Sequence, residues 1–216
     1  MCGVIGFCSD KVSFDDLKTL KRILIASQIR GKHASGFAWY DGSKIQVSSY
    51  ALPMEEALKQ FSLKQCIYNH SIAFIAHTRY STSSIKFHQP ILIDNTAIVH
   101  NGVISQSSPK NWRALYGYSC ETENDSELLL RCILQGDDPK KQFPEASIAA
   151  LILTPNGEIK PMRNAKRPLW RGQLGSGIVY ASTWHILSEA GVEHIQKKKI
   201  FEDLQRRDMR QWGDIV

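Results

Sequence analysis

The sequence predicts a single domain of the α+β class with mainly antiparallel strands. Short apolar runs bounded by turn residues are typical of strands, and they outnumber the segments with helical periodicity. Two pairs of these runs are separated by Asp41-Gly42 and Asn156-Gly157, dipeptides that favour the tight turns of antiparallel hairpins. A chain of 216 residues with 43% hydrophobic composition can bury one sizeable core, and no internal repeat or linker divides it.

Helices are expected over three ranges, which are 13–31, 53–65 and 121–136. The first begins with Ser13 and Asp16 at the spacing of a capping box, and its apolar residues recur at helical spacing. The second begins at Pro53, which suits the first helical position because that position needs no backbone N–H donor. The third would be capped by Thr122 or Asn124. The first and third ranges each end at a glycine, a typical helix stop.

Strands are expected within seven ranges, which are 2–7, 35–40, 44–50, 71–77, 96–102, 147–157 and 177–183. Two of these strands lead directly into polar residues: the run at 71–77 continues as Thr-Arg-Tyr-Ser-Thr, and the run at 96–102 ends in His-Asn-Gly. Catalytic and binding groups concentrate in loops at the ends of regular elements. These two strand ends are therefore candidate functional positions.

Charge and cysteine content exclude several classes of protein. The net charge is +6, but the basic residues are scattered except near the end of the chain, so no nucleic-acid partner is expected. No apolar run reaches about 18 residues and the start lacks a secretory pattern, so we expect no membrane span and a cytoplasmic location. Five cysteines without a CxxC pair indicate neither a disulfide framework nor a structural metal site.

The segment 194–216 is basic and carries apolar residues among its charges. Phe201 and Trp212 could anchor a partner protein, because aromatic and arginine side chains are favoured at the centres of interfaces. The alternative is that the segment forms a helix and a strand that close the domain. The sequence leaves both interpretations open.

Cys2 directly follows the initiator methionine. A cysteine at the start of an apolar strand can be a small buried hydrophobe. Removal of Met1, which a small second residue allows, would instead leave Cys2 with both a thiol and a free α-amine. This amine titrates close enough to the thiol to act as its general base. Position alone does not decide between a core cysteine and an N-terminal nucleophile.

Three further positions have both a structural and a functional interpretation. Arg79 can cap a loop or form a salt bridge, or its planar fork can bind a carboxylate through two hydrogen bonds. Asn101-Gly102 can be an ordinary turn, or the side-chain amide and the glycine N–H can form an oxyanion site. Asp125 can cap a helix or bind an ammonium group. Spacing alone cannot choose between these alternatives.

Seven motifs, taken in order, favour the functional alternatives; they are MCGVIGF, RGKHASG, IAHTRYST, HQPI, IVHNGVI, ETENDSELL and PLWRGQLGSGIVYAST. From Cys2 to about Thr183 they resemble the glutaminase domain of class II glutamine amidotransferases, which are N-terminal nucleophile hydrolases. The resemblance implies that residues 1–216 form a single domain. It also implies a four-layer αββα sandwich, in which two antiparallel sheets pack face to face with helices outside.

The resemblance implies a role for each candidate residue. Cys2 would attack the side-chain amide of L-glutamine, and Asn101 and Gly102 would hold the oxyanion. Arg79 would bind the α-carboxylate of glutamine and Asp125 its α-ammonium. Ammonia would leave, and water would then release glutamate from a γ-glutamyl thioester. The reaction would need no metal and no organic cofactor.

Two features of the chain modify this expectation. His33 stands where the family pattern usually has an acid, which changes the contacts of that loop, whereas Thr82 fits an additional substrate contact. The chain ends about where a glutaminase domain ends, so we expect ammonia to pass to a separate acceptor synthetase. The alternatives are an independent amidohydrolase of a γ-glutamyl compound and a non-catalytic interaction module. The retained oxyanion and glutamine-binding residues argue against the module.

Overall fold

The computed structural model describes residues 2–80 and 88–197. The larger of its two sheets has eight strands, which are β1 (Gly3–Ser9), β2 (Ala34–Tyr40), β3 (Ile45–Tyr50), β4 (Ile67–Tyr68), β5 (Ser71–Arg79), β10 (Trp170–Leu174), β11 (Gly177–Ala181) and β12 (Glu193–Lys197). The smaller sheet has four strands, which are β6 (Ile91–Ile93), β7 (Thr96–His100), β8 (Ala149–Leu153) and β9 (Ile159–Arg163). The α-helices are α1 (Phe14–Ala26), α2 (Met54–Gln60), α3 (Trp112–Tyr116), α4 (Ser126–Leu134), α5 (Pro139–Gln142) and α6 (Trp184–Glu189). Short 3₁₀ segments are η1 (Ser27–Arg30), η2 (Leu63–Cys66) and η3 (Pro109–Asn111).

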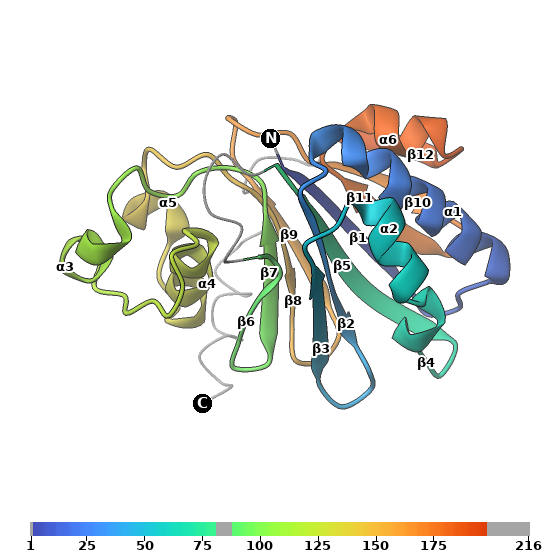
Figure 1. The fold of residues 1–216 in the computed structure, drawn as a ribbon, viewed down its shortest axis with the longest axis horizontal. Helices are drawn as coiled ribbons and strands as arrows, with labels where there is room; N and C mark the ends of the chain where they lie inside the picture. The colour runs from blue at the N-terminus through green and yellow to red at the C-terminus, as the bar shows by residue number, and fades with distance from the viewer. Residues whose placement is uncertain (1, 81–87, 198–216) are drawn as a thin grey trace.

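The two sheets lie face to face between two layers of helices (Figure 1). Their strands run in the orders β12-β10-β11-β1-β5-β2-β3, with β4 also beside β5, and β6-β7-β8-β9. Every pairing is antiparallel. Helices α1, α2 and α6 cover the larger sheet, and α3, α4 and α5 lie beside the smaller one. The predicted four-layer αββα sandwich is confirmed.

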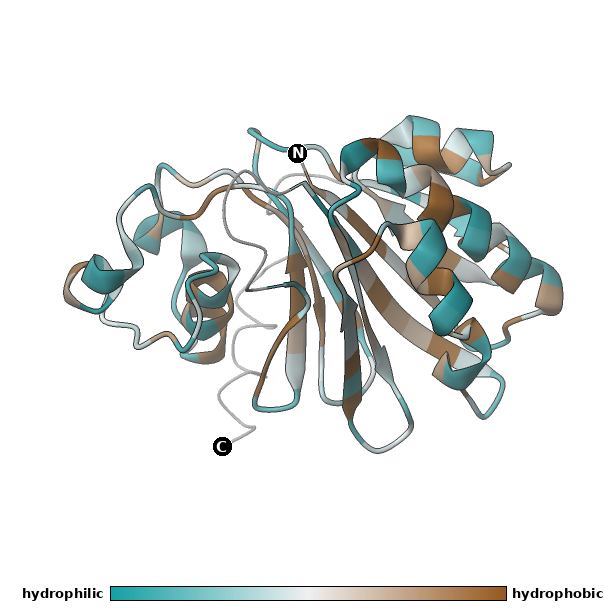
Figure 2. Cartoon of the chain, in the orientation of Figure 1, coloured by the Kyte–Doolittle hydropathy of each residue, from teal (hydrophilic) through white to brown (hydrophobic). Residues whose placement is uncertain are grey.

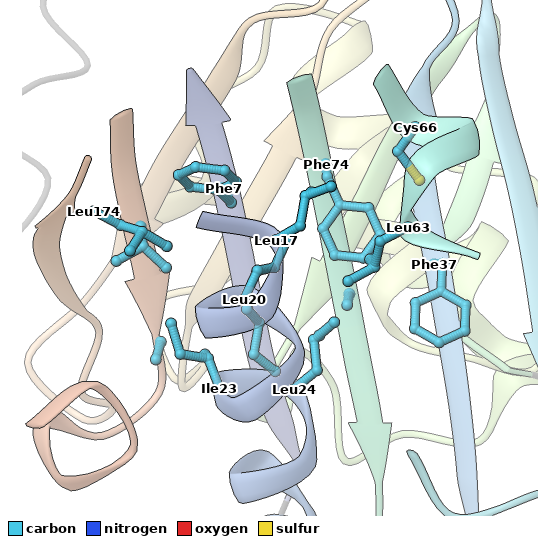
Figure 3. Close-up of a cluster of buried hydrophobic side chains, with 14 of the residues drawn as sticks. Phe7, Leu17, Leu20, Ile23, Leu24, Phe37, Leu63, Cys66, Phe74 and Leu174 are labelled. Carbon is cyan, nitrogen blue, oxygen red and sulfur yellow. The ribbon is translucent and has the colours of Figure 1, made fainter. Parts of the chain in front are cut away.

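Three hydrophobic cores fill the three spaces between the layers. Successive strand residues point to opposite faces, so β1 places Val4 between the sheets and Ile5 under the helices. Helix α1 buries Leu20, Ile23 and Leu24 completely against the larger sheet (Figure 3). Burial of each side chain stabilises the fold by roughly 1.5–3 kcal/mol. Figure 2 shows the matching pattern, with brown along the central strands and alternating brown and teal along the helices.

The predicted helices are present but shorter than their ranges. Ser13 and Asp16 form the expected capping box of α1, and the last predicted turn is the 3₁₀ segment η1. Pro53 is the N-cap of α2 rather than its first helical residue. In the third range, Asn124 accepts a hydrogen bond from the Ser126 N–H, and α4 starts only there. The residues before Ser126 instead fold around the buried carboxylate of Glu127, which explains the late start.

Both predicted hairpins are confirmed. Strands β2 and β3 turn at Asp41-Gly42, and β8 and β9 turn at Asn156-Gly157. At the other end of the larger sheet, β12 is an edge strand on β10, so the first residues of the segment 194–216 belong to the domain. Residues 198–216 lie outside the described ranges, and a partner-facing role for them stays a prediction.

Two expectations from composition can be compared with the structure. All five cysteines are free in the structure. Among the described residues, no helix is both long and apolar enough to cross a membrane.

Candidate active site

The start of β1 directs Cys2 toward the space between the sheets. Val4 and Cys8 both contribute to the core between the sheets, and Cys2 has the same parity along the strand. Cys2 is half-buried and free. It therefore lies at the open end of the inter-sheet layer rather than in the core.

The end of β5 lies beside Cys2. The antiparallel register pairs Gly3 with Thr78, so continuing it by one residue brings Cys2 opposite Arg79. Arg79 lies six residues after Ala73 and four after Ile75, both even intervals, so it shares their inter-sheet face. The guanidinium of Arg79 is thus presented on the same face of the sheet as the Cys2 thiol.

His33, which replaces the expected acid, contacts the residues just beyond this strand end. Its backbone N–H donates to the carbonyl of Arg79 at 3.0 Å, and its ring packs against Tyr80 with 5.1 Å between ring centroids. His33 therefore contacts the last residue of β5 through its backbone and Tyr80 through its ring. Thr82 lies outside the described residues, and its predicted substrate contact stays a prediction.

Asn101 and Gly102 do not form a turn. The ladder with the opposite strand continues through them, because Asn101 exchanges two backbone hydrogen bonds with Ala149, and Val103 exchanges two with Ser147. The intervening Gly102 N–H therefore points away from this ladder, and within the described residues it has no hydrogen-bond acceptor. The turn interpretation of this dipeptide is wrong.

The side chain of Asn101 points into the inter-sheet layer, following Ala97 and Val99. The residue is 2% exposed, and its Nδ2 has no hydrogen-bond partner within residues 2–80 and 88–197. Buried amide groups without partners are rare because losing hydration costs about 1–3 kcal/mol. Two unpaired donors, the Asn101 amide and the Gly102 N–H, thus lie next to each other at one strand end.

Gly102 is required by close approach of the neighbouring strand. A Cβ atom there would lie 1.7 Å from the carbonyl oxygen of Ser147 and 2.6 Å from Nε2 of His100. Any side chain would displace backbone, so only glycine keeps this N–H in place.

Asp125 does not cap α4, although it precedes the helix directly. Its Oδ2 instead accepts a hydrogen bond of 2.6 Å from the N–H of Ile104, two residues beyond Gly102. Burial lowers the pKa of His100, and the negative charge of Asp125 partly opposes this shift. The carboxylate of Asp125 therefore contacts the segment that follows β7, and its negative charge acts on His100 at the end of that strand.

Two arginines join Cys2 to this strand end, and sequence reasoning assigned neither of them a role. Arg30 Nε donates to the carbonyl oxygen of Cys2 at 3.3 Å, and Arg167 Nε donates to Ser147 Oγ at 3.2 Å. Burial lowers the pKa of Arg30, the positive charge of Arg167 adds to this effect, and Cys2 opposes it. Cys2 and the Asn101-Gly102 segment therefore lie at the same end of the sandwich, where the N-terminus is marked in Figure 1. A sequence signal did exist, since Arg30 begins the motif RGKHASG and Arg167 directly precedes PLW.

His77 is a buried neutral histidine beside the site. Burial, followed by the positive charge of Arg79, lowers its pKa to about 3. Its Nε2 has no hydrogen-bond partner among the residues the structure covers, and the same holds for Nδ1 of His88. No group of three histidine, cysteine or carboxylate residues in the described chain could hold a metal ion. The Nε2 of His77 thus adds a polar group to the inter-sheet face of β5 that also carries Arg79.

The structure thus brings together most of the residues that the sequence singled out. Cys2, Arg79, Asn101 and Gly102 lie at one end of the inter-sheet layer, and Asp125 is hydrogen-bonded to the same strand end. The thiol, a cationic fork, a carboxylate and two unpaired donors are the groups needed to bind an amino acid and stabilise an oxyanion.

The fold was compared with known proteins. No protein-family model and no curated sequence matches the chain. Among solved structures, glutamine phosphoribosylpyrophosphate amidotransferase from B. subtilis superposes with a TM-score of 0.69 and 23% identity, over 92% of this chain and 46% of that chain. A structure described as the allosteric regulatory enzyme of purine biosynthesis gives 0.71 and 23%, over 92% and 45%. A glutamine aminotransferase class-II domain protein from Silicibacter pomeroyi gives 0.50 and 10%, over 93% and 92%.

These comparisons support the class that the motifs resemble, at the level of the fold. The chain spans a little under half the length of the first two structures and nearly the whole of the third. The shared architecture is the sandwich of two antiparallel sheets between helical layers.

Proposed function

From this fold and site we propose that the protein is a glutaminase of the class II glutamine amidotransferase type, which hydrolyses L-glutamine to glutamate and ammonia. The observation that carries the proposal is the pair of unpaired donors on Asn101 and Gly102, at the same end of the inter-sheet layer as Cys2. A buried donor without a partner is costly in the free protein, and a developing oxyanion would satisfy it.

Cys2 is the proposed nucleophile after Met1 has been removed. Its α-amine takes the thiol proton, and the thiolate attacks the carbonyl carbon (Cδ) of the glutamine side-chain amide. The tetrahedral intermediate collapses to a γ-glutamyl thioester as the C–N bond breaks, and the nitrogen leaves as ammonia with the proton returned by the amine. Water then adds to the thioester carbon, the C–S bond breaks, and glutamate leaves with the thiol restored.

Asn101 Nδ2 and the Gly102 N–H are the proposed donors to the oxyanion in both steps. Each such donor is worth roughly 3–4 kcal/mol of transition-state stabilisation in comparable hydrolases. The ladder on both sides of Gly102 fixes these donors before substrate arrives. No free energy is therefore needed to orient the two donors during the reaction.

Arg79 and Asp125 are proposed to select free glutamine. The Arg79 fork suits the α-carboxylate, and Asp125 suits the α-ammonium, with Thr82 as a further contact. Oδ2 of Asp125 is held by the Ile104 N–H, which fixes the carboxylate near the oxyanion donors. A glutamine within a peptide has neither charge at its α-carbon substituents, so it would not bind this pair.

A separate acceptor enzyme is the proposed destination of the ammonia. The aligned region makes up less than half of each of two longer solved structures, one of them an amidotransferase by its description, so in those proteins the same fold is joined to further sequence. Co-purification of the native protein, followed by glutamine-dependent product formation, is the direct way to identify this enzyme.

The test of the proposed function compares Cys2→Ala with Cys8→Ala. Cys8 lies on the same strand, is partly buried, and has its pKa raised by burial, so it is a matched control. We expect intact-mass analysis to show loss of Met1, and glutamate release to be abolished in Cys2→Ala but retained in Cys8→Ala. Substantial activity in Cys2→Ala, or in a form with a peptide added before Met1, would overturn the N-terminal nucleophile.

A further inference from the structure

Gln89 lies where the larger sheet, the smaller sheet and the N-terminus of α4 meet. The residue is 7% exposed and precedes β6 by two positions. Its backbone packs directly on β2, since a Cβ atom at Gly36 would lie 1.9 Å from the Gln89 carbonyl oxygen. The backbone of Gln89 is thus fixed against the larger sheet while its side chain extends to the smaller one.

The side-chain amide of Gln89 forms the two hydrogen bonds with His100 that the backbone of a neighbouring strand would otherwise form. Strand β6 pairs with β7 only from Thr96 to Ile98, which leaves the outward backbone groups of His100 without a strand partner. Gln89 Oε1 accepts the His100 N–H at 2.5 Å, and Gln89 Nε2 donates to the His100 carbonyl at 3.1 Å. The amide therefore extends the ladder by one step, up to the residue before Asn101.

A directional chain of hydrogen bonds starts at the same amide. Nε2 of His100 lies 3.1 Å from the Ser147 carbonyl, which can only accept, so this nitrogen carries the proton. Burial lowers the pKa of His100 and so favours the neutral ring. In the neutral ring with the proton on Nε2, Nδ1 accepts from Ser126 Oγ at 3.1 Å. The single hydroxyl proton of Ser126 is donated to His100, so Ser126 Oγ can only accept the hydrogen bond from Gln89 Nε2, at 2.9 Å. The chain runs from Gln89 through Ser126 and His100 to Ser147, and it requires a donor at Gln89.

This series of hydrogen bonds connects to both the proposed oxyanion donors and the proposed ammonium-binding carboxylate. The Ser147 carbonyl also accepts the N–H of Val103, directly after Gly102. Ser126, which is fully buried, directly follows Asp125. One side chain is therefore bonded to the residue before the oxyanion donors and to the residue after the ammonium-binding carboxylate.

We propose that Gln89 is a positioning residue, which holds the Asn101-Gly102 donors and Asp125 in register through its bonds to His100 and Ser126. Gln89 does not touch substrate in this arrangement and acts through its neighbours. The proposal rests on the proposed glutaminase function for its kinetic consequence, but its structural consequence can be measured without activity.

The test uses two variants and one control. Gln89→Met keeps the length and burial of the side chain but removes both the donor and the acceptor. Gln89→Glu keeps the acceptor and, when ionised, lacks the donor. Tyr118→Phe is the matched control, because Tyr118 is 2% exposed and donates a partly buried hydrogen bond of 2.7 Å to Asp137 in the helical layer, away from the site.

For Gln89→Met we expect kcat for glutamine hydrolysis to fall roughly 10- to 100-fold, since misplacing oxyanion donors has costs of this order. Alkylation of Cys2 by iodoacetamide, followed on the N-terminal peptide, should proceed at the wild-type rate because this displacement forms no oxyanion. Amide hydrogen exchange in residues 97–104 should become faster. Tyr118→Phe should change neither kcat nor this exchange.

Gln89→Glu adds a readout that a general loss of stability does not give. Its carboxyl group would face His100 and Ser126, with the charges of Asp125 and Arg167 acting on His100. Protonation restores the missing donor, so the ratio of variant to wild-type activity should rise as the pH falls from about 8 to about 5. A ratio independent of pH would contradict the directional chain.

Two results would overturn the proposal: a kcat for Gln89→Met within about twofold of wild type, or unchanged exchange in residues 97–104. If the wild-type protein releases no ammonia from glutamine, the proposed function fails, and the exchange measurement still decides whether Gln89 holds this strand end.

Discussion

Replacing Asn101 with leucine should make the protein more stable and less active at the same time. Asn101 Nδ2 is buried without a hydrogen-bond partner among the described residues, so the folded protein loses the hydration of this group without compensation. Such a group costs about 1–3 kcal/mol. Leucine has a similar shape and no polar atoms, so we expect the free energy of unfolding to rise by about 1 kcal/mol. For a chain of 216 residues this corresponds to an increase in Tm of about 2–4 °C.

The same substitution removes one of the two proposed oxyanion donors. Loss of such a donor reduces kcat by roughly 100- to 1000-fold, about 2.7–4 kcal/mol. KM for glutamine should change little, because the donor acts mainly on the transition state. The measurements are glutamate release at steady state and thermal unfolding of the same preparations.

Asn164→Leu is the control, because this asparagine is fully bonded. Its Nδ2 donates to the Ala146 carbonyl at 2.7 Å, and its Oδ1 accepts from the Ile148 N–H at 3.0 Å. Its replacement leaves partners unsatisfied and should lower the free energy of unfolding by about 1–3 kcal/mol. If Asn101→Leu lowered Tm as Asn164→Leu does, the Asn101 amide would be bonded in the free protein. If kcat stayed within a few-fold of wild type, Asn101 would not be an oxyanion donor.

Three other predictions concern neighbouring residues. Arg79→Lys and Asp125→Asn should each raise KM for glutamine at least about tenfold, because an ammonium lacks the bidentate fork and an amide lacks the charge; steady-state values within about twofold of wild type would refute the assigned contacts. Gly102→Ala should abolish activity and lower Tm, since its Cβ would lie 1.7 Å from the Ser147 carbonyl oxygen; wild-type kinetics would show that the N–H is not used. His77 has its pKa lowered to about 3, mainly by burial, against about 6.5 in the unfolded chain, so the unfolded state binds the proton more tightly. The stability it contributes is fully present above about pH 6.5 and is lost as the pH falls towards 3, and urea titrations should show a smaller loss in His77→Phe.

Features that depend on adjacent residues could be predicted from the sequence. The capping box of Ser13 and Asp16 and the hairpin turn at Asp41-Gly42 are set by local backbone chemistry, and both are present. Helices α3, α5 and α6 were not predicted, because segments of four to six residues are too short to show helical periodicity.

Features that depend on distant residues could not be predicted in the same way. Asp125 precedes a helix, and the local rule favours capping. Its carboxylate instead accepts a hydrogen bond from the N–H of Ile104, which lies far back in the chain. Gln89 lies in the motif HQPI and Arg167 directly precedes PLW, but no local rule indicates their hydrogen-bond partners, which come from other parts of the chain. The resemblance of ordered motifs supplied the candidate residues, and only the fold shows which side of each strand they occupy.

The order of the four layers connects the proposed site to two opposite outer faces of the molecule. Arg30, which donates to the Cys2 carbonyl, follows α1 on the outer face of the larger sheet, whereas Asp125 directly precedes α4 on the outer face of the smaller one. The two helical layers are separated by both sheets (Figure 1). The proposed nucleophile and the proposed ammonium-binding carboxylate are therefore each connected to a different outer layer of the sandwich.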